Sequence, residues 1–403
     1  MSGTTEDVAI RPFTIEIPEA ELEALRARVA ATRWPDPELV TDFSQGVQQA
    51  VMQEFARYWA TEYDLRRCET RLSALPNFVT EIEGLDIHFI HVRSPRENAL
   101  PIIITHGWPG SVIELLNVVD PLTNPTAHGA SAADAFDVVI PSMPGYGYSG
   151  KPRDLGWGPV RIAHAWDVLM KRLGYTRYVA QGGDWGAIIT DLMGVQAPSG
   201  LLGIHTNMAG VVPPDVWTYL ARDVLGAAGP PPSGLSEEEK RTFEQLKFFF
   251  ERGVGYGVQL GTRPQTMYGL ADSPVDLAAW MINHDEASYQ DIAEAFAGNP
   301  VGGLTRDEVL DNVTLTWLTN TGVSSARLYW ENTVGFFDVK GVSIPAAVST
   351  FAHEIYKVPR SWAEQAYPKL IYFNELDRGN HFAAWQEPAL FAEELRAAFR
   401  SLR

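Results

Sequence analysis

One short segment has the residue types and spacing of a nucleophile on a tight turn. The sequence Gly-Gly-Asp-Trp-Gly at 182–186 lies between an expected strand at 178–180 and an expected helix at 187–195. The glycines allow a sharp turn that lifts Asp184 into a cleft, toward which the N–H groups of the helix start also point. A glycine-rich turn with a helix-capping aspartate is the alternative. The spacing makes Asp184 a candidate nucleophile.

Two other segments supply partners for a nucleophile in that position. The sequence His-Gly-Trp-Pro-Gly-Ser at 106–111 directly follows an expected strand at 102–105. Such a loop contributes a backbone N–H to an oxyanion hole, here that of Trp108, and the N–H of Trp185 supplies the second donor. His381 follows the last expected strand, so it is the candidate base. The chain order is then nucleophile, acid and histidine.

The acid of this set must follow an earlier strand. Glu354 comes just after the expected strand that contains 348–351. Asp377 is the competitor, but it precedes His381 by only four residues in the same loop. We therefore favour Glu354 as the residue that orients His381.

An aspartate at this turn selects a particular chemistry. A carboxylate with a pKa of about 3.9 is ionised at neutral pH and can attack an sp³ carbon without a base. Asp184 would form an alkyl ester, and His381 would then deprotonate the water that hydrolyses it. Glu354 would hold the imidazole, while the oxyanion hole would stabilise the tetrahedral intermediate. The expected substrates are epoxides or haloalkanes.

The leaving group distinguishes these two substrates. An opening epoxide becomes an alkoxide that needs a proton donor, and tyrosine suits this role, whereas a halide needs only N–H donors. Tyr256 and Tyr329 look most loop-like or nearest a segment edge. The helical region offers five tyrosines in all, which are Tyr219, Tyr256, Tyr268, Tyr289 and Tyr329.

The elements that must position these residues indicate an α/β-hydrolase fold with a mostly parallel central sheet. Strands alternate with helices on both sides of a long, mainly helical interruption, which predicts a sheet with an inserted lid. The chain start is acidic and loose, and helices are expected at 18–34 and 47–63. The expected parts are an N-terminal extension wrapping the core (1–80), the first core part (81–210), the helical lid (211–340) and the second core part (341–403).

Composition excludes several partners. Among 403 residues, 50 acidic and 32 basic side chains give a net charge of −18, which opposes binding to nucleic acid or to an anionic membrane. Cys68 is the only cysteine, and neither a signal peptide nor a long apolar run is apparent, so we expect a cytoplasmic protein. Metal and nucleotide motifs are absent, and we expect neither a metal nor a cofactor. His284-Asp285 and His353-Glu354 are weak metal candidates.

Taken together, the motifs resemble those of the microsomal-type epoxide hydrolases, a branch of the α/β-hydrolase superfamily. The resemblance covers nearly the whole chain. It is carried by 11–13, 32–35, 106–111, 182–186, 272–280 and 381–388. It implies Asp184 as nucleophile, His381 as base, Glu354 as acid, and Tyr256 and Tyr329 as the lid tyrosines that donate to the epoxide oxygen. Eukaryotic microsomal members carry an N-terminal membrane anchor that this chain lacks, so we expect a soluble bacterial relative.

The sequence thus predicts an epoxide hydrolase that converts a small-molecule epoxide to a vicinal diol. A haloalkane dehalogenase and a catalytically silent binding protein on the same scaffold are the alternatives. The aromatic content, 12 Trp, 14 Tyr and 18 Phe, suggests an apolar or aromatic epoxide. A role in bacterial secondary metabolism is a further hypothesis. The oligomeric state stays open, with a homodimer as one option.

Overall fold

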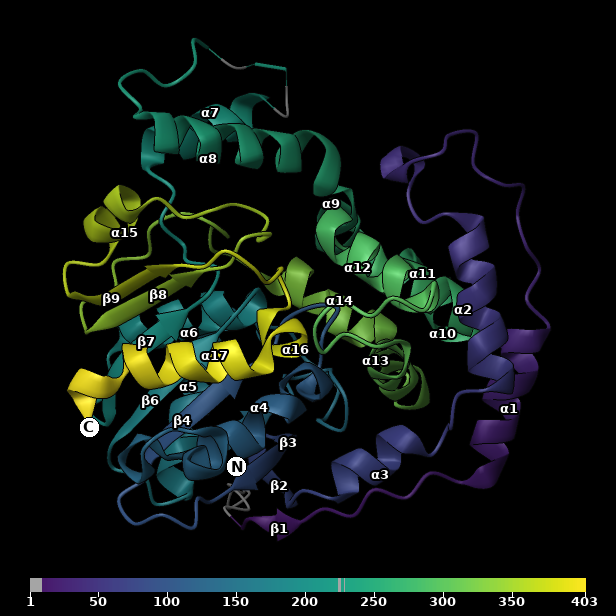
Figure 1. Ribbon diagram of the computed structural model, residues 1–403, viewed down its shortest axis with the longest axis horizontal. Coiled ribbons are helices and arrows are strands. Elements are labelled where there is room, and N and C mark those ends of the chain that lie inside the picture. The colour runs from purple at the N-terminus through teal and green to yellow at the C-terminus, as the bar shows by residue number, and fades with distance from the viewer. Residues whose placement is uncertain (1–8, 224–225, 228) are drawn as a thin grey trace, which may run out of the picture.

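A computed structural model describes residues 9–223, 226–227 and 229–403. Most of the expected loose, acidic start therefore lies outside the described residues. Within them, the chain forms one sheet of nine strands in the order β1-β2-β3-β5-β4-β6-β7-β8-β9 (Figure 1). The strands are β1 Arg11–Pro12, β2 Asn77–Ile82, β3 Leu85–Val92, β4 Leu100–Thr105, β5 Phe136–Pro141, β6 Tyr178–Gly182, β7 Leu201–Thr206, β8 Ala346–Thr350 and β9 Leu370–Glu375.

The sheet is parallel from β5 to β9 and antiparallel at its β1–β3 edge. Strands β4, β5, β6 and β8 are almost wholly buried, as expected for parallel strands covered on both faces. The expected mostly parallel sheet is confirmed. Strand β7 was not anticipated, because Gly203 and His205 interrupt its apolar pattern, although both are buried.

Helices cover both faces of the sheet. On one face, α5 Pro159–Arg172 packs against α6 Trp185–Gln196, and on the other α4 Leu116–Thr123 packs against α17 Pro388–Ala398 (Figure 1). The apolar residues of α5 recur every three or four positions, which places them on one buried face. This packing holds β4, β6 and the turns that follow them in fixed relative positions.

A helical segment separates β7 from β8, and part of it covers the carboxyl ends of the strands. The Ser236 hydroxyl accepts a hydrogen bond from Glu239 N–H in a capping box that starts α8, as its sequence predicts. The helices are α7 Pro214–Asp223, α8 Glu237–Phe248, α9 Gly255–Thr262, α10 Gly269–Asp272, α11 Pro274–Ile282, α12 Glu286–Phe296, α13 Arg306–Leu318 and α14 Gly322–Glu331. After β8 come α15 Arg360–Ala366 and α16 Ala383–Gln386.

The N-terminal helices join the sheet to this helical segment. Helices α1 Glu19–Ala30, α2 Gln49–Thr61 and α3 Arg67–Ser73 contact α11, α12 and α13, respectively, while β1 extends the sheet edge (Figure 1). Buried Asp311 on α13 pairs with Arg67 and Arg71 of α3. The N-terminal segment therefore contacts both the sheet and the helices over the site. The four domain boundaries given above stay a prediction.

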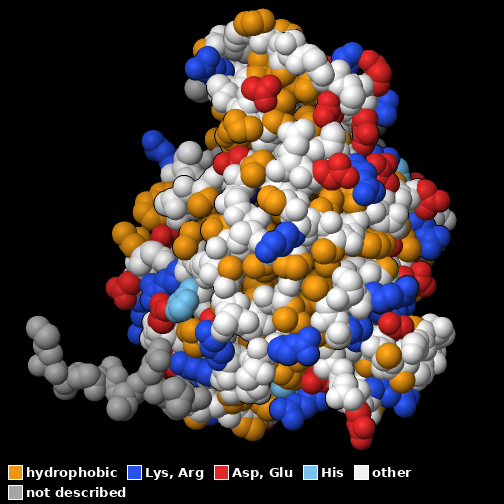
Figure 2. All heavy atoms as spheres, turned by 90° about the vertical axis from the view of Figure 1, so that its left-hand side faces the viewer, with side chains coloured by type: hydrophobic (Ala, Val, Ile, Leu, Met, Phe, Trp, Pro, Cys, Tyr) orange, Lys and Arg blue, Asp and Glu red, His pale blue; other side chains and the backbone are white. Residues whose placement is uncertain are grey.

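The surface is mixed in character. On the face in Figure 2, acidic and basic side chains are interspersed among hydrophobic ones. Among the described residues, no helix combines the length and apolar character needed to cross a bilayer.

Candidate active site

Asp184 occupies a strained turn between β6 and α6. Its backbone has φ 51° and ψ −124°, outside the regions that a non-glycine residue normally adopts. A Cβ on Gly182 would lie 2.0 Å from the Gly186 carbonyl oxygen, and one on Gly186 would lie 2.0 Å from that of Thr105. Both positions therefore require glycine. The turn presents the Asp184 carboxylate beyond the end of the sheet.

The loop after β4 reaches this carboxylate. The Trp108 N–H donates to Asp184 Oδ1 at 2.7 Å, so the backbone donor expected from the sequence lies beside the candidate nucleophile. A side chain at position 107 would collide with Asp184, which explains the glycine there. In the described structure, the Trp185 N–H forms no hydrogen bond with this carboxylate, so its part in the oxyanion hole stays a prediction.

His381 lies between two carboxylates. Its Nδ1 is 2.5 Å from Glu354 Oε1, and its Nε2 is 3.6 Å from Asp184 Oδ2. All three side chains are buried. Asp377, the alternative acid, is exposed. Glu354 is thus the carboxylate that the fold brings to His381, through the loop that follows β8.

Electrostatics favour a charged imidazole in this arrangement. Burial lowers the pKa of His381, but the charges of Glu354 and Asp184 and the hydrogen bond to Glu354 outweigh it. Together they raise this pKa well above its ordinary value. Esterification of Asp184 would remove one of these charges, and the proton affinity of His381 would then fall. The geometry suits a base that acts after the carboxylate has reacted.

Tyr256 and Tyr329 lie close enough to Asp184 for its charge to act on both phenols. Their rings are 6.1 Å apart, and both hydroxyl groups are buried. Burial is the main reason that the pKa of each phenol is well above its usual range, and the nearby Asp184 charge adds to it. The expectation that they occupy loops was wrong, since Tyr256 is the second residue of α9 and Tyr329 belongs to α14. Both are near helix ends, as the segment-edge alternative predicted.

The other three candidate tyrosines make different contacts. Tyr268 is 68% exposed. The Tyr289 hydroxyl accepts the N–H of Gln48, and Tyr219 packs against Phe243. None of these contacts involves the carboxylate at the elbow.

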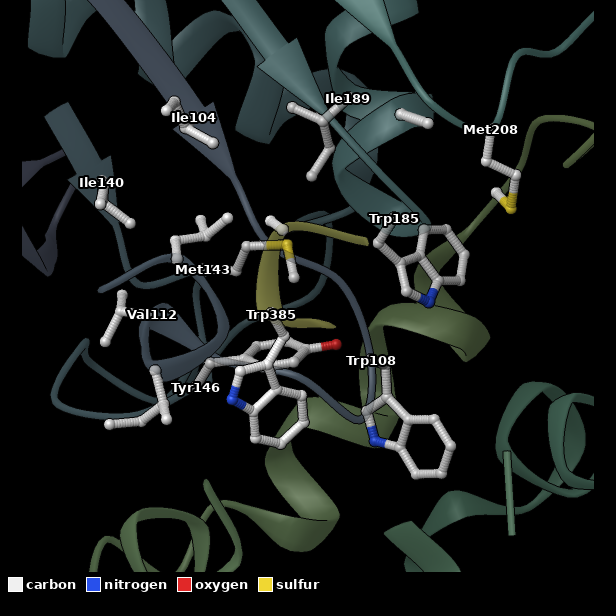
Figure 3. Packing of buried hydrophobic residues seen from close by; sticks show 14 of the residues in the cluster. Ile104, Trp108, Val112, Ile140, Met143, Tyr146, Trp185, Ile189, Met208 and Trp385 are labelled. Atoms are coloured by element: carbon white, nitrogen blue, oxygen red, sulfur yellow. The ribbon is translucent and has the colours of Figure 1, made fainter. Parts of the chain in front are cut away.

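Aromatic rings surround the two tyrosines beside Asp184. Trp108 stacks on Tyr256 at 5.3 Å, and Trp185 meets Tyr329 edge-on at 4.7 Å. Figure 3 shows Trp108, Trp185 and Tyr146 around the end of β4. A narrow space with room for about one water molecule borders both Asp184 and His381.

Two buried ionisable residues at the site were missed or set aside by sequence reasoning. His284, which precedes α12, contacts Tyr256 and stacks on His381. Glu114 lies in the turn after the Trp108 loop, where burial and the Asp184 charge raise its pKa to about 8. The sequence held one signal for Glu114, which is its position three residues after the motif at 106–111.

His284 also belongs to a group of three side chains that has the spacing of a metal site, and it is the one such group among the described residues. One ligand atom from each of Asp184, His284 and His381 lies within 4.8 Å of the others. His284 Nε2 lies beside the Tyr256 hydroxyl, and His381 Nε2 lies beside the Asp184 carboxylate. The other nitrogen of each already contacts Asp285 or Glu354. A carboxylate contact of this kind on Nδ1 occurs both in histidines that transfer protons and in histidines that bind metal ions.

Comparison with known proteins agrees with this geometry. A family profile described as "Epoxide hydrolase N terminus" matches residues 10–115, and one described as "alpha/beta hydrolase fold" matches 101–235. The chain is 49% identical to a "Putative epoxide hydrolase" of Stigmatella aurantiaca, with 98% of this chain and 86% of that protein aligned. The chain belongs to the epoxide hydrolases.

Further relatives extend this family membership. Identity is 34% to "Epoxide hydrolase 1" of Oryctolagus cuniculus, over 97% of this chain and 88% of the rabbit protein. The crystal structure of juvenile hormone epoxide hydrolase from Bombyx mori superposes with a TM-score of 0.84 at 30% identity, covering 98% of this chain and 96% of that one. The similarity thus includes the N-terminal segment, the core and the helices above the site.

Proposed function

We propose that this protein hydrolyses an epoxide to a vicinal diol through an ester on Asp184. The observation that carries the proposal is the Asp184 carboxylate, set between the Trp108 N–H and the His381–Glu354 pair. Tyr256 and Tyr329, whose hydroxyl groups are both buried, are the donors that an epoxide oxygen needs.

In the first step, the carboxylate attacks an epoxide carbon. Asp184 Oδ1 is held by the Trp108 N–H, so Oδ2 is the oxygen that forms the new bond to carbon. The C–O bond of the ring breaks, and its electrons go to the epoxide oxygen. Tyr256 and Tyr329 donate to this oxygen as it becomes an alkoxide.

In the second step, water hydrolyses the ester. His381 removes a proton from a water molecule in the small space beside Asp184, and the hydroxide adds to the ester carbonyl. Glu354 stabilises the imidazolium, and the Trp108 N–H stabilises the negative charge that develops on Oδ1. Collapse of the intermediate releases the diol and restores the carboxylate.

The apolar walls also support a substrate class. Trp108 stacks flat on Tyr256, Trp185 meets Tyr329 edge-on, and Phe336 packs edge-on against Trp185. We infer a bulky apolar or aromatic epoxide. A panel of terminal, internal and polycyclic epoxides tests this inference, and turnover of small polar epoxides alone would contradict it. The cytoplasmic location, the role in secondary metabolism and the homodimer stay predictions.

A single turnover in ¹⁸O-labelled water tests the mechanism. The diol of the first turnover should carry no label, because its new oxygen comes from Asp184, while the peptide containing Asp184 should gain one ¹⁸O. Label in that first diol would indicate direct attack by water. The Asp184→Asn variant should lose turnover, apart from slow recovery if the amide deamidates.

The alternatives give different results in the same assays. Epoxide turnover without halide release from haloalkanes would exclude the dehalogenase. A silent binding protein would form neither diol nor ester. The tyrosine pair favours the epoxide, because a halide leaving group needs no proton.

A further inference from the structure

His284 contacts both the tyrosine acid and the histidine base, and the steps above give it no role. Its Nε2 lies 2.8 Å from the Tyr256 hydroxyl. Its ring stacks on that of His381, with centroids 4.6 Å apart and planes at 24°. Its side chain is almost completely buried. An imidazole in this position can either accept the hydroxyl hydrogen of Tyr256 or donate a hydrogen to the phenol oxygen.

Asp285 fixes the tautomer of this imidazole. Asp285 Oδ2 is 3.0 Å from His284 Nδ1, and Oδ1 accepts the Ser288 N–H at 2.8 Å, which anchors the carboxylate at the start of α12. Burial raises the pKa of Asp285, but its hydrogen bond to His284 and the charges of His284 and His381 outweigh burial and bring it to about 2. The ionised carboxylate accepts the Nδ1 hydrogen. Nε2 then carries a hydrogen only when the ring is protonated.

The protonation state of His284 therefore decides where the hydroxyl hydrogen of Tyr256 points. Beside a neutral ring, the phenol donates its only hydrogen to His284 Nε2 and has none for the substrate. Beside an imidazolium, the Nε2–H donates to the phenol oxygen. The phenol hydrogen is then free for the epoxide oxygen.

We propose that His284, held by Asp285, is a positioning residue whose imidazolium form directs the Tyr256 proton to the epoxide and then replaces it. This inference rests on the proposed function. As the ring C–O bond breaks, the alkoxide takes the Tyr256 proton, and the phenolate takes the proton from His284 Nε2. His284 is left neutral. The proton released when Asp184 returns to its carboxylate form balances this uptake, so the overall reaction is epoxide plus water to diol.

The groups that face His284 can accommodate its charge. Asp285 contacts it directly, and Asp184 lies nearby at the elbow, so two carboxylates face this ring. His381 stacks on it and opposes a second positive charge, but Glu354 compensates on the far side of His381. The other close rings, Trp108, Tyr256 and Phe382, are neutral. Three carboxylates thus face two imidazoles.

The His284→Gln variant tests the proposal, because glutamine offers a hydrogen-bonding amide that does not titrate. Rapid quenching and intact-mass analysis give the rate of ester formation and, separately, its hydrolysis. Between about pH 5.5 and 9, wild-type ester formation should fall at least about tenfold as one group loses a proton. In the variant this dependence should vanish, and the rate at about pH 6 should be ~10- to 100-fold lower. Ester hydrolysis should stay within about threefold of wild type.

Two further variants separate proton positioning from structural effects. Asp285→Asn keeps a side-chain oxygen for the Ser288 N–H but turns an NH₂ group toward His284 Nδ1. The neutral ring then carries its hydrogen on Nε2 and leaves the phenol hydrogen free, so the pH dependence of ester formation should flatten. His164→Gln changes an exposed histidine on α5 and should leave the profile unaltered. All assays contain EDTA, because a metal ion bound to Asp184, His284 and His381 would imitate loss of the relay.

The outcomes distinguish this inference from the proposed function. If wild type forms no Asp184 ester, the proposed function fails. If wild type forms the ester and folded His284→Gln forms it at the same rate with the same pH dependence, only the role of His284 is wrong. If ester formation in His284→Gln is slowed equally at every pH and keeps the pH dependence of wild type, the role of His284 is also wrong.

Discussion

Replacing Glu354 with glutamine should stop the reaction between its two steps. The carboxylate accepts from His381 Nδ1 at 2.5 Å and from the Ile355 N–H at 2.8 Å through the same oxygen, Oε1, while Oε2 is buried without a partner in the described structure. If the glutamine carbonyl takes the position of Oε1, its NH₂ group takes the position of Oε2, where it is buried without a partner. A glutamine in the flipped orientation donates to Nδ1 and forces the proton onto Nε2. In both orientations His381 loses its counter-charge.

The size of the effect follows from removal of a buried charge partner. Such removal costs about 3 to 5 kcal/mol, and each ~1.4 kcal/mol corresponds to a tenfold change in rate. Ester hydrolysis should therefore slow by about 10² to 10⁴-fold. Attack by Asp184 needs no base, so ester formation should proceed at close to the wild-type rate. The ester should accumulate.

Intact-mass analysis after mixing Glu354→Gln with an epoxide measures this accumulation directly. We expect nearly all of the protein to gain the mass of one epoxide, and a peptide map should place it on Asp184. Asp377→Asn is the matched control, because Asp377 is exposed in the loop before His381 and should turn over normally. A fall in turnover without an adduct would refute the assignment of Glu354 to hydrolysis. Ester build-up in Asp377→Asn would refute the choice between the two acids.

Three other changes probe the donors, the turn and a buried acid. Tyr256→Phe or Tyr329→Phe should slow ester formation about 10²-fold and the double variant about 10⁴-fold, as measured by rapid quench. Gly186→Ala puts a Cβ 2.0 Å from the Thr105 carbonyl, so urea unfolding should show a loss of about 3 kcal/mol. Glu114 has a folded pKa of about 8 against 4.5, so its protonated form stabilises the fold at low pH, and this stability is lost as pH rises toward 8. From about pH 5 to 8.5, Glu114→Gln should therefore gain on the order of 2 to 4 kcal/mol relative to wild type in urea titrations.

The sequence by itself located the turn that carries the proposed nucleophile and the loop that faces it. A turn such as 182–186 follows from local steric rules, since only glycine tolerates a carbonyl oxygen 2.0 Å from a Cβ position. The same locality explains why the strands that precede Asp184 and Trp108 were predicted correctly. Identification of His381 used only chain order along the alternating strands and helices, which the sheet topology preserves.

Tertiary structure decided the contacts between residues that are remote in sequence. The sequence singled out Tyr256 and Tyr329 among five tyrosines only by segment edges and by resemblance. The packing of α9 against α14, with Tyr256 on Trp108 and Tyr329 on Trp185, is what separates them physically from the other three. The contact of Glu354 with His381 depends on how two loops at neighbouring strand ends fold together. His284 was set aside as a weak metal candidate, because no local pattern reveals a ring stacked on another 97 residues away. Such contacts arise when distant segments share one buried space, and a linear pattern holds no record of that geometry.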